Sequence, residues 1–225
     1  MDTTTDSPIT DIQPYSPEWW NLRHGCFTGS EFFKLVGEPR SKAAKEDGEL
    51  SDTALTYILE KVHEKLTGLT KMGIDNFATQ WGVEHEPLAA KWYAKLTGNT
   101  LIDPTLCFHS TLEGFSCTPD KFVGEDGLCE IKCPANGANH LKHCFITTNE
   151  YFKKEHPDKY WQVMVQMNIT GRKWCDFVSF DPRINSDMGM FIYRVEYSET
   201  EGKFIEDKLK KAREIYNEYL TLFSK

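Results

Sequence analysis

The sequence lacks any apolar run that approaches the roughly 20 residues of a membrane-spanning helix. Its N-terminal segment, MDTTTDSPITDIQPYS, lacks the positive and then apolar pattern of a secretory signal. The seven cysteines are an odd number without paired spacing, which argues against a disulfide framework and against a zinc–thiolate site. We therefore expect a cytoplasmic protein with reduced thiols and no membrane partner.

The chain also lacks a positive charge balance, because 26 Lys and Arg residues stand against 34 Asp and Glu residues and give a net charge of −8. An acidic excess opposes the approach of DNA phosphates, which argues against a histone-like or sequence-reading DNA binder. It argues less against a metal-dependent nuclease, whose carboxylates are partly neutralised by bound cations. Basic residues concentrate in two stretches, 34–45 and 153–159, which we expect to supply local positive charge.

Residues 1–16 are polar and acidic, and we expect them to be a flexible segment. Internal repeats and low-complexity linkers are absent, so we expect one domain over 17–225. Capping residues and hydrophobic periodicity predict the secondary structure. Helices are predicted to begin at Ser16-Pro17 and at a capping box over 28–31, and to cover 53–67, 76–97, 158–170 and the segment 205–223, with a loop over 41–52. Strands are predicted over 100–109, 114–123 and 127–133, as a meander, and over 173–180 and 189–197. This order predicts an α/β fold with a central mixed sheet flanked by helices.

The 76–97 helix carries an apolar stripe along one face. Its members are Trp81, His85, Leu88, Trp92 and Leu96. We expect this stripe, together with the other helical tryptophans, to pack into the core.

The motif with the clearest chemistry is Pro119-Asp120, followed after nine residues by Glu130-Ile131-Lys132. Glu130 and Lys132 lie two apart on a predicted strand, so they point to the same face, and a hairpin would bring Asp120 beside them. Two carboxylates are hard oxygen ligands suited to Mg²⁺, and the carbonyl of Ile131 is placed to add a third. Lys132 would then orient a water or help to deprotonate it for in-line attack on a phosphate. The spacing alone also fits an ordinary turn aspartate and a solvent-facing strand.

Five segments in one order make the interpretation more specific. They are WWNLRHGCFTGSE, WGVEHEPLAAKWY, CTPDKF, CEIKCP and WQVMVQMNITGRKWCDFVSFDPR, and they span about residues 17–184. In order and separation they resemble the phage lambda-type exonucleases, also called viral recombinase nucleases, of the PD-(D/E)XK superfamily. The resemblance implies a PD-(D/E)XK nuclease-like central mixed sheet flanked by helices. It also implies a dependence on Mg²⁺, with Mn²⁺ as a substitute and one or two ions bound.

The same resemblance implies roles for the matching residues. Glu86 would be a metal ligand that reaches in from outside the sheet, and Asp120 and Glu130 would be the central ligands. Lys132 would be the catalytic lysine, and Gln162 would hold the attacking water or a nearby phosphate. Without a role in the site, Glu86 would be an exposed helix glutamate and Gln162 a polar helix residue.

Arg23 and Ser30, in the pattern L-R-x-G-x-x-T-x-S, resemble the pocket that binds the 5′-phosphate of a DNA end. A guanidinium suits that task because its planar fork binds phosphate in a bidentate manner. The N-terminus of the helix predicted at Thr28 would add backbone N–H groups. Trp19 and Trp20 are alternatives for stacking on an end base.

The sequence departs from the lambda protein at one position. Ser110 stands where that protein has an additional aspartate, and His109 and Glu113 are neighbours that would have to substitute. A one-metal or asymmetric site is therefore an open alternative. An iron–sulfur subgroup is disfavoured because Cys175 alone follows Gln162. Three further histidines show no pairing signature and are expected to be structural: His24, His85 and His140.

The resemblance implies an enzyme that digests one strand of linear double-stranded DNA from its 5′ end to mononucleotides and leaves a 3′ overhang for recombination by strand annealing. A closed homotrimer and a single-strand annealing protein are the implied partners. Three alternatives stay open: an endonuclease or 3′→5′ exonuclease on the same scaffold, a non-catalytic DNA-binding module, and a metal-dependent phosphatase.

Overall fold

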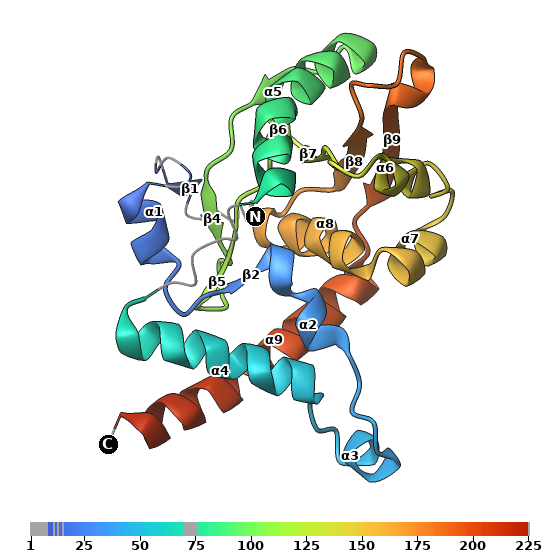
Figure 1. The fold of residues 1–225 in the computed structure, drawn as a ribbon. Coiled ribbons are helices and arrows are strands. Elements are labelled where there is room, and N and C mark those ends of the chain that lie inside the picture. Colours follow the sequence, from blue (N-terminus) through green and yellow to red (C-terminus); the bar gives the residue numbers. More distant parts are fainter. Residues whose placement is uncertain (1–8, 11, 13, 15, 70–75, 225) are drawn as a thin grey trace, which may run out of the picture.

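The computed structural model describes residues 9, 10, 12, 14, 16–69 and 76–224 (Figure 1). The segment 1–16, which the sequence predicts to be flexible, lies mostly outside the described residues. Within the described part of the chain, no helix combines the length and the apolar character needed to cross a membrane.

Strands of the described residues form two sheets. The larger has the order β3-β6-β7-β8-β9 and comprises Leu101–Ile102, Lys121–Val123, Gly127–Lys132, Trp174–Phe180 and Met190–Glu196. The smaller has the order β1-β4-β5-β2 and comprises Ile9–Thr10, Leu106–Phe108, Phe115–Cys117 and Phe27–Thr28. In the larger sheet β7 runs parallel to β8, while the other neighbours are antiparallel. The predicted mixed sheet flanked by helices is confirmed.

The predicted meander is wrong, because two of its strands are each divided between the two sheets. The segment 100–109 splits into β3 and β4, and 114–123 splits into β5 and β6. A proline lies at each break, Pro104 in one and Pro119 in the other, and proline cannot donate a hydrogen bond to a sheet ladder. The chain therefore passes from one sheet to the other just before Asp120.

The helices of the described chain are α1 Pro17–Leu22, α2 Phe33–Val36, α3 Lys42–Glu46, α4 Asp52–Thr67, α5 Phe77–Thr97, α6 Gly137–His143, α7 Asn149–Glu155, α8 Pro157–Thr170 and α9 Glu199–Phe223, with 3₁₀ turns η1 Gly29–Glu31 and η2 Asp187–Gly189. Helices α4 and α8 end at Gly68 and Gly171, whose φ angles of 66° and 68° suit glycine. Both ends agree with the sequence prediction.

The short helical segment predicted after Thr28 is confirmed, as η1 and α2, but its capping box and the loop over 41–52 are wrong. Thr28 makes no capping hydrogen bond with its side chain, and only the 3₁₀ turn η1 and one turn of α2 follow it. The predicted loop over 41–52 contains α3, which begins because the Ser41 side chain accepts a hydrogen bond from the N–H of Ala44.

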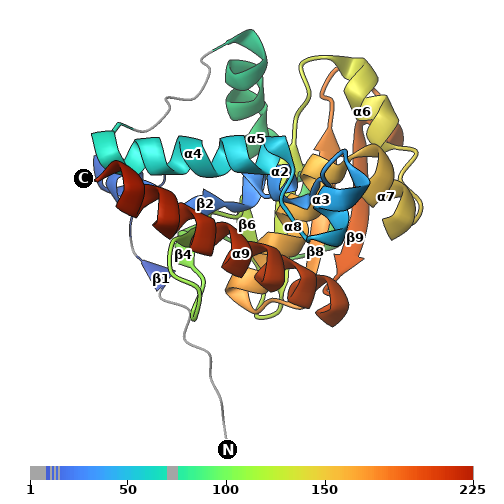
Figure 2. The same cartoon turned by 90° about the horizontal axis from the view of Figure 1, so that it is seen from below.

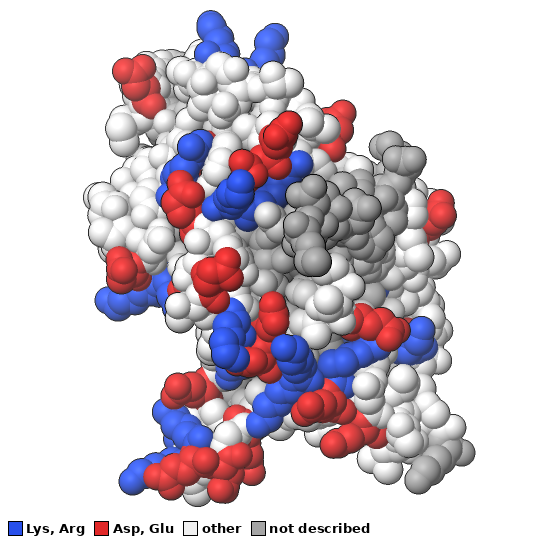
Figure 3. Space-filling view, turned by 180° about the vertical axis from the view of Figure 1, so that it is seen from behind, with Lys and Arg blue, Asp and Glu red and all other residues white. Residues whose placement is uncertain are grey.

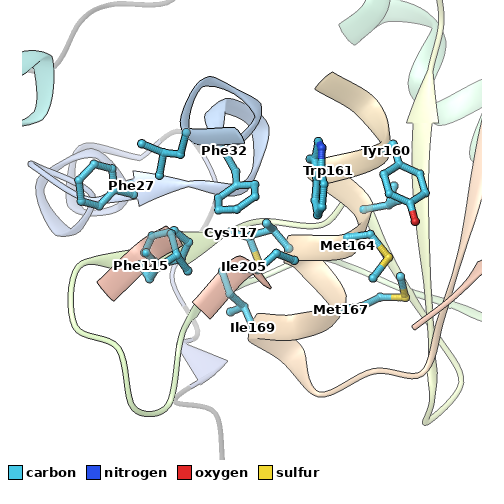
Figure 4. Close-up of a cluster of buried hydrophobic side chains, with 14 of the residues drawn as sticks. Phe27, Phe32, Phe115, Cys117, Tyr160, Trp161, Met164, Met167, Ile169 and Ile205 are labelled. Atoms are coloured by element: carbon cyan, nitrogen blue, oxygen red, sulfur yellow. The ribbon is translucent and has the colours of Figure 1, made fainter. Parts of the chain in front are cut away.

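Helix α8 lies centrally and touches strands of both sheets, β4 and β5 on one side and β8 on the other (Figure 1). Its buried side chains pack among aromatic residues from distant parts of the chain, as Figure 4 shows. The Trp161 ring centroid lies 5.7 Å from that of Phe32 and 5.2 Å from that of Phe204. Helices α4 and α9 pack against each other below α8 (Figure 2). This packing holds the buried face of α8 in place between the two sheets.

The apolar stripe predicted to bury one face of α5 instead faces outward along much of its length. Leu88, Trp92 and Leu96 are 41%, 47% and 61% exposed. The buried face consists of Ala89, Ala90 and Tyr93. The two alanines are small, so they allow α5 to lie close to β7 and bring Glu86 toward the sheet. Trp19 and Trp161 are buried, as predicted.

Candidate active site

The β6–β7 hairpin places the two central carboxylates opposite each other. Its register pairs Lys121 with Cys129, so Asp120 lies across from Glu130. The backbone N–H of Ile131 donates a hydrogen bond of 2.6 Å to Asp120 Oδ2. The two-residue spacing puts Glu130 and Lys132 on one face of β7. Accordingly, Lys132 Nζ donates a hydrogen bond to Glu130 Oε1. The structure therefore brings together the aspartate, glutamate and lysine that the sequence singled out.

Glu130 is fully buried, and both of its carboxylate oxygens are engaged. Besides Lys132, Oε1 accepts a hydrogen bond of 2.6 Å from Gln162 Nε2. Oε2 accepts one of 2.7 Å from Gln166 Nε2. A buried carboxylate without such partners would be strongly destabilising, so this network is a condition for keeping the charge inside the fold.

Gln166 is a site residue that the sequence reasoning missed. It lies one helical turn after Gln162 on α8, and a four-residue spacing places two side chains on the same helix face. The Nε2 of Gln166 holds Glu130, while its Oε1 is buried and has no hydrogen-bond partner among the described residues. The Q-x-x-x-Q spacing in the sequence was the available signal.

Glu86, from α5, completes the carboxylate group. Burial and the nearby Glu130 raise the pKa of Glu86, although Lys121 and Lys132 act in the opposite direction. Burial and the charge of Glu130 also raise the pKa of Asp120 well above its ordinary value. Three carboxylates thus repel one another at the end of the hairpin.

Lys132 is the cation nearest to this group. Burial alone would lower its pKa, but the carboxylates of Glu130 and Asp120 raise the pKa of Lys132 above its ordinary range. The lysine is therefore protonated in this arrangement. In that state Lys132 can donate hydrogen bonds to an anion or to a water.

The donor set fits a divalent cation. Among the described residues, no three Asp, Glu, His or Cys side chains already converge as a metal-binding group. The carboxylate of Glu130 accepts hydrogen bonds from Lys132, Gln162 and Gln166. However, carboxylates that raise one another's pKa are hard oxygen ligands whose repulsion a bound Mg²⁺ or Mn²⁺ would relieve. The roles of Glu86, Asp120, Glu130 and the Ile131 carbonyl as ligands stay predictions.

All of these residues line one cavity of about 910 Å³, which also receives Arg23 and Ser30. Arg23 stacks its guanidinium over the Trp19 ring at 3.9 Å from the centroid. The Trp19 indole N–H donates a hydrogen bond of 3.1 Å to Thr118 Oγ1, two residues before Asp120. Trp19 therefore connects the arginine to the carboxylate strand, and its burial argues against stacking on a base.

The helix N-terminus predicted at Thr28 offers less to a 5′-phosphate than the sequence suggested. The 3₁₀ turn that follows Thr28 has three residues, so its dipole is small. The N–H of Thr28 itself donates to the Tyr57 hydroxyl at 3.1 Å. Ser30 is exposed at the cavity wall, where its hydroxyl is available.

Ser110 and its suggested substitutes lie outside this cavity. His109 Nδ1 accepts hydrogen bonds from the N–H groups of Thr111 and Leu112, and Glu113 forms an ion pair of 3.7 Å with Arg213. All three residues line a separate, smaller cavity. The idea that His109 or Glu113 replaces a metal-binding aspartate is therefore wrong.

His85 and His140 have structural contacts, as expected. His85 stacks on Trp81 with ring centroids 3.9 Å apart. The ring nitrogens of His140 form hydrogen bonds with the Ser179 hydroxyl and with the backbone carbonyl of Met188.

The two basic stretches do not form the free positive patches expected from the sequence. In the first stretch, Lys34 pairs with Glu31 and Glu60, and Lys45 pairs with Glu38. In the second stretch, Lys153, Lys154 and Lys159 pair with Glu201, Glu155 and Asp158. Figure 3 shows the result on one face, where acidic and basic side chains are interspersed.

The fold and the arrangement of Asp120, Glu130 and Lys132 define a PD-(D/E)XK nuclease-like α/β protein. A family model, the YqaJ-like viral recombinase domain, matches residues 18–173. The chain belongs to this family, which confirms the resemblance to the viral recombinase nucleases.

Solved structures agree with the family assignment. An alkaline exonuclease, LHK-Exo, from Laribacter hongkongensis is 31% identical, with 93% of this chain and 96% of that chain covered and a TM-score of 0.76. LHK-Exo in complex with dAMP gives 30% identity, coverage of 92% and 96%, and a TM-score of 0.77. A phage-related exonuclease from Haemophilus somnus, at 23% identity, 91% and 99% coverage and a TM-score of 0.72, supports the fold alone. No curated protein sequence matches the chain.

The carboxylate repulsion predicts a specific dependence of stability on pH. Because the folded-state pKa values of Asp120 and Glu86 are raised, their contribution is fully present below the unfolded-state values of about 4 and is lost as pH rises through the folded-state values. In EDTA, the wild-type melting temperature should therefore fall more steeply between pH 5 and pH 8 than that of Asp120→Asn. Differential scanning fluorimetry would measure a difference of roughly 2–4 °C for each kcal/mol of relieved repulsion.

Added Mg²⁺ should stabilise the wild type at pH 8 and have little effect on Asp120→Asn. Equal pH dependence of the two proteins in EDTA would contradict the repulsion.

Proposed function

We propose that the chain is a Mg²⁺-dependent 5′→3′ exonuclease that digests one strand of linear double-stranded DNA to mononucleotides and leaves a 3′ overhang. The observation that carries the proposal is one cavity in which Glu86, Asp120, Glu130 and Lys132 lie together with Arg23. Membership in a viral recombinase family and the likeness to an alkaline exonuclease support a nuclease acting on DNA.

The residues of the cavity can divide the work of phosphodiester hydrolysis. A divalent ion held by Glu86, Asp120 and Glu130 would supply a Lewis acid for a phosphate oxygen. Protonated Lys132 would donate to the attacking water or to the phosphate, and Gln162 would orient the same group. Water adds to phosphorus and the bond from phosphorus to the 3′ oxygen breaks, so the released nucleotide has a 3′ hydroxyl and the remaining strand has a new 5′-phosphate.

That product chemistry suits a pocket for a 5′-phosphate, because each cleavage regenerates the group that the pocket binds. Arg23 and Ser30 supply a cationic fork and a hydroxyl in the same cavity as the carboxylates. LHK-Exo has been crystallised with dAMP, a mononucleotide of the kind that such a reaction releases. These points favour the 5′→3′ direction over an endonuclease or a 3′→5′ exonuclease.

We further propose that the chain acts as a homotrimer together with a single-strand annealing protein in phage-type recombination. The acidic chain, with its basic stretches neutralised by ion pairs, would hold DNA weakly as a monomer. An assembly that encloses the duplex would offset that weakness. Leu88, Trp92 and Leu96 on α5 leave apolar surface exposed in one copy, which a subunit interface would cover.

The catalytic assignment predicts that Lys132→Ala and Glu130→Gln each abolish cleavage while the protein stays folded. The assay is an end-labelled linear duplex incubated with Mg²⁺, with Mn²⁺ or with EDTA. Circular dichroism would check the fold, and Lys91→Ala, on the exposed face of α5, is the matched control. Full activity of both site variants, or of the wild type in EDTA, would overturn the assignment and leave a non-catalytic DNA-binding module or a metal-independent enzyme.

The 5′-phosphate pocket predicts a preference for phosphorylated ends. A charge-assisted contact contributes about 1.5–3 kcal/mol, which is roughly ten- to a hundredfold in rate when it acts in the transition state. The wild type should therefore digest a 5′-phosphorylated duplex faster than a 5′-hydroxyl duplex by that factor. Arg23→Ala should remove most of the difference, and Arg23→Lys should recover part of it, because an ammonium retains the charge but loses the fork.

Initial rates on the two duplexes decide this point. Equal wild-type rates on both ends would remove the pocket and leave a nuclease of unassigned direction.

The proposed assembly predicts that light scattering at micromolar protein gives three times the monomer mass of 26.0 kDa. Trp92→Glu would place a charge in the exposed apolar stripe and should shift the population toward monomer. Lys203→Glu, on the exposed face of α9, serves as the control for an added negative charge. A wild-type monomer at this concentration would contradict the proposal.

A further inference from the structure

The cavity has a second wall that the proposed catalytic residues leave unused. It is formed by α6 and the N-terminal end of α8, and Asn139, Lys142, His143, His156 and Lys159 line it. We call these five residues the α6–α8 wall. Figure 1 shows α6 and α1 on opposite sides of α8, so this wall and Arg23 flank the carboxylates from different directions.

The α6–α8 wall carries two lysines, Lys142 and Lys159. Lys142 forms no ion pair with any residue that the structure describes. Lys159 pairs with Asp158 at 2.6 Å, and Glu155, which also lines the cavity, pairs with Lys154 at 3.1 Å. Burial, then His156 and Lys159, lower the pKa of His143 to about 3.

The N-terminal end of α8 forms part of the same wall. The Nε2 atom of His156 is buried and has no hydrogen-bond partner among the described residues. His156 is the N-cap of α8 but provides no capping hydrogen bond from its side chain. The N-terminal, positive end of the 14-residue helix α8 thus lies at the cavity wall.

Helix α8 sets the order of the groups along the cavity. A Cβ placed on Gly29, next to Ser30, would lie 3.4 Å from Val165 Cγ1 and 3.8 Å from the carbonyl oxygen of Gln162. Gln162 reaches Glu130, and Lys159 lies about 4.5 Å further toward the helix N-terminus. Gly29 and Glu130 therefore lie beside the same stretch of α8, residues 162–166, and Lys159 lies further toward the N-terminal end of the helix, next to the rest of the α6–α8 wall.

A strand whose 5′ end occupies the Arg23 side and whose scissile phosphate faces the carboxylates would reach the α6–α8 wall, which lines the same cavity on another side. We propose that this wall binds the phosphodiesters on the 3′ side of the scissile bond, with Lys142 and Lys159 as the contacting residues. The inference rests on the proposed 5′→3′ exonuclease function. It adds a second anchoring site, which would hold the remaining strand in place after each nucleotide leaves.

The test removes charge from the protein in one experiment and from the DNA in another. Lys142→Gln/Lys159→Gln should raise KM for a 5′-phosphorylated duplex about tenfold and leave kcat nearly unchanged. Each lost phosphate contact should also reduce the slope of log(kcat/KM) against log salt concentration by about 0.7–0.9. Lys42→Gln/Lys203→Gln, two exposed lysines on α3 and α9 that do not line the cavity, is the matched control.

A substrate with one uncharged methylphosphonate linkage locates the contact. Placed at the second or third linkage from the 5′ end, it should slow the first cleavage by the wild type, and it should add little to the defect of the lysine variant, because both changes remove the same interaction. Additive defects, no effect at either linkage, or an equal salt response of the control variant Lys42→Gln/Lys203→Gln would overturn the inference. If the wild type degrades no duplex, the proposed function itself fails. If it degrades duplex but shows additive defects, the inference alone fails.

Discussion

Glu130 is a fully buried carboxylate, and the rest of the site is arranged around the need to keep its charge inside the fold. Lys132, Gln162 and Gln166 each donate a hydrogen bond to it. The two glutamines require α8 to be held rigidly over the sheet, which the aromatic packing around Trp161 achieves (Figure 4). Asp120 and Glu86 then add like charges that no neighbouring lysine fully offsets. The fold thus maintains a concentration of negative charge for which a divalent cation is the natural complement.

The sequence was most informative where geometry is periodic and local. The two-residue spacing of Glu130 and Lys132 and the hairpin to Asp120 follow from strand geometry, and the structure brings these side chains together. Glu86 could not be placed by spacing, because its approach depends on α5 packing against β7 through Ala89 and Ala90. Only the family resemblance indicated it.

The predictions that failed depended on long-range partners. The apolar stripe of α5 was assigned to the core, but small residues form the buried face because close packing against the sheet leaves no room for Leu88 or Trp92. The basic stretches appeared free because the acids that neutralise them, such as Glu60 and Glu201, lie far along the chain. Gln166 was missed although its spacing from Gln162 was visible, because nothing local indicated that both side chains reach the same carboxylate.

These features explain how an acidic protein can handle a polyanion. Among the residues that line the cavity, basic side chains lie on two sides, Arg23 on one and the α6–α8 wall on the other, and Lys132 lies beside the carboxylates. The phosphates of a DNA strand would be attracted by the basic side chains on these two sides. A cation bound by the carboxylates would reverse the negative charge between them. Catalysis and DNA binding would then depend on the same ion.

The most direct test of this account is Mn²⁺ binding measured by electron paramagnetic resonance, since it reports the cation without requiring cleavage. We expect the wild type to bind Mn²⁺ at pH 8, with Mg²⁺ competing, and we expect Asp120→Ala to lose most of that binding while Lys91→Ala retains it. Equal Mn²⁺ binding by the wild type and Asp120→Ala would contradict the claim that the carboxylates around Glu130 form the cation site.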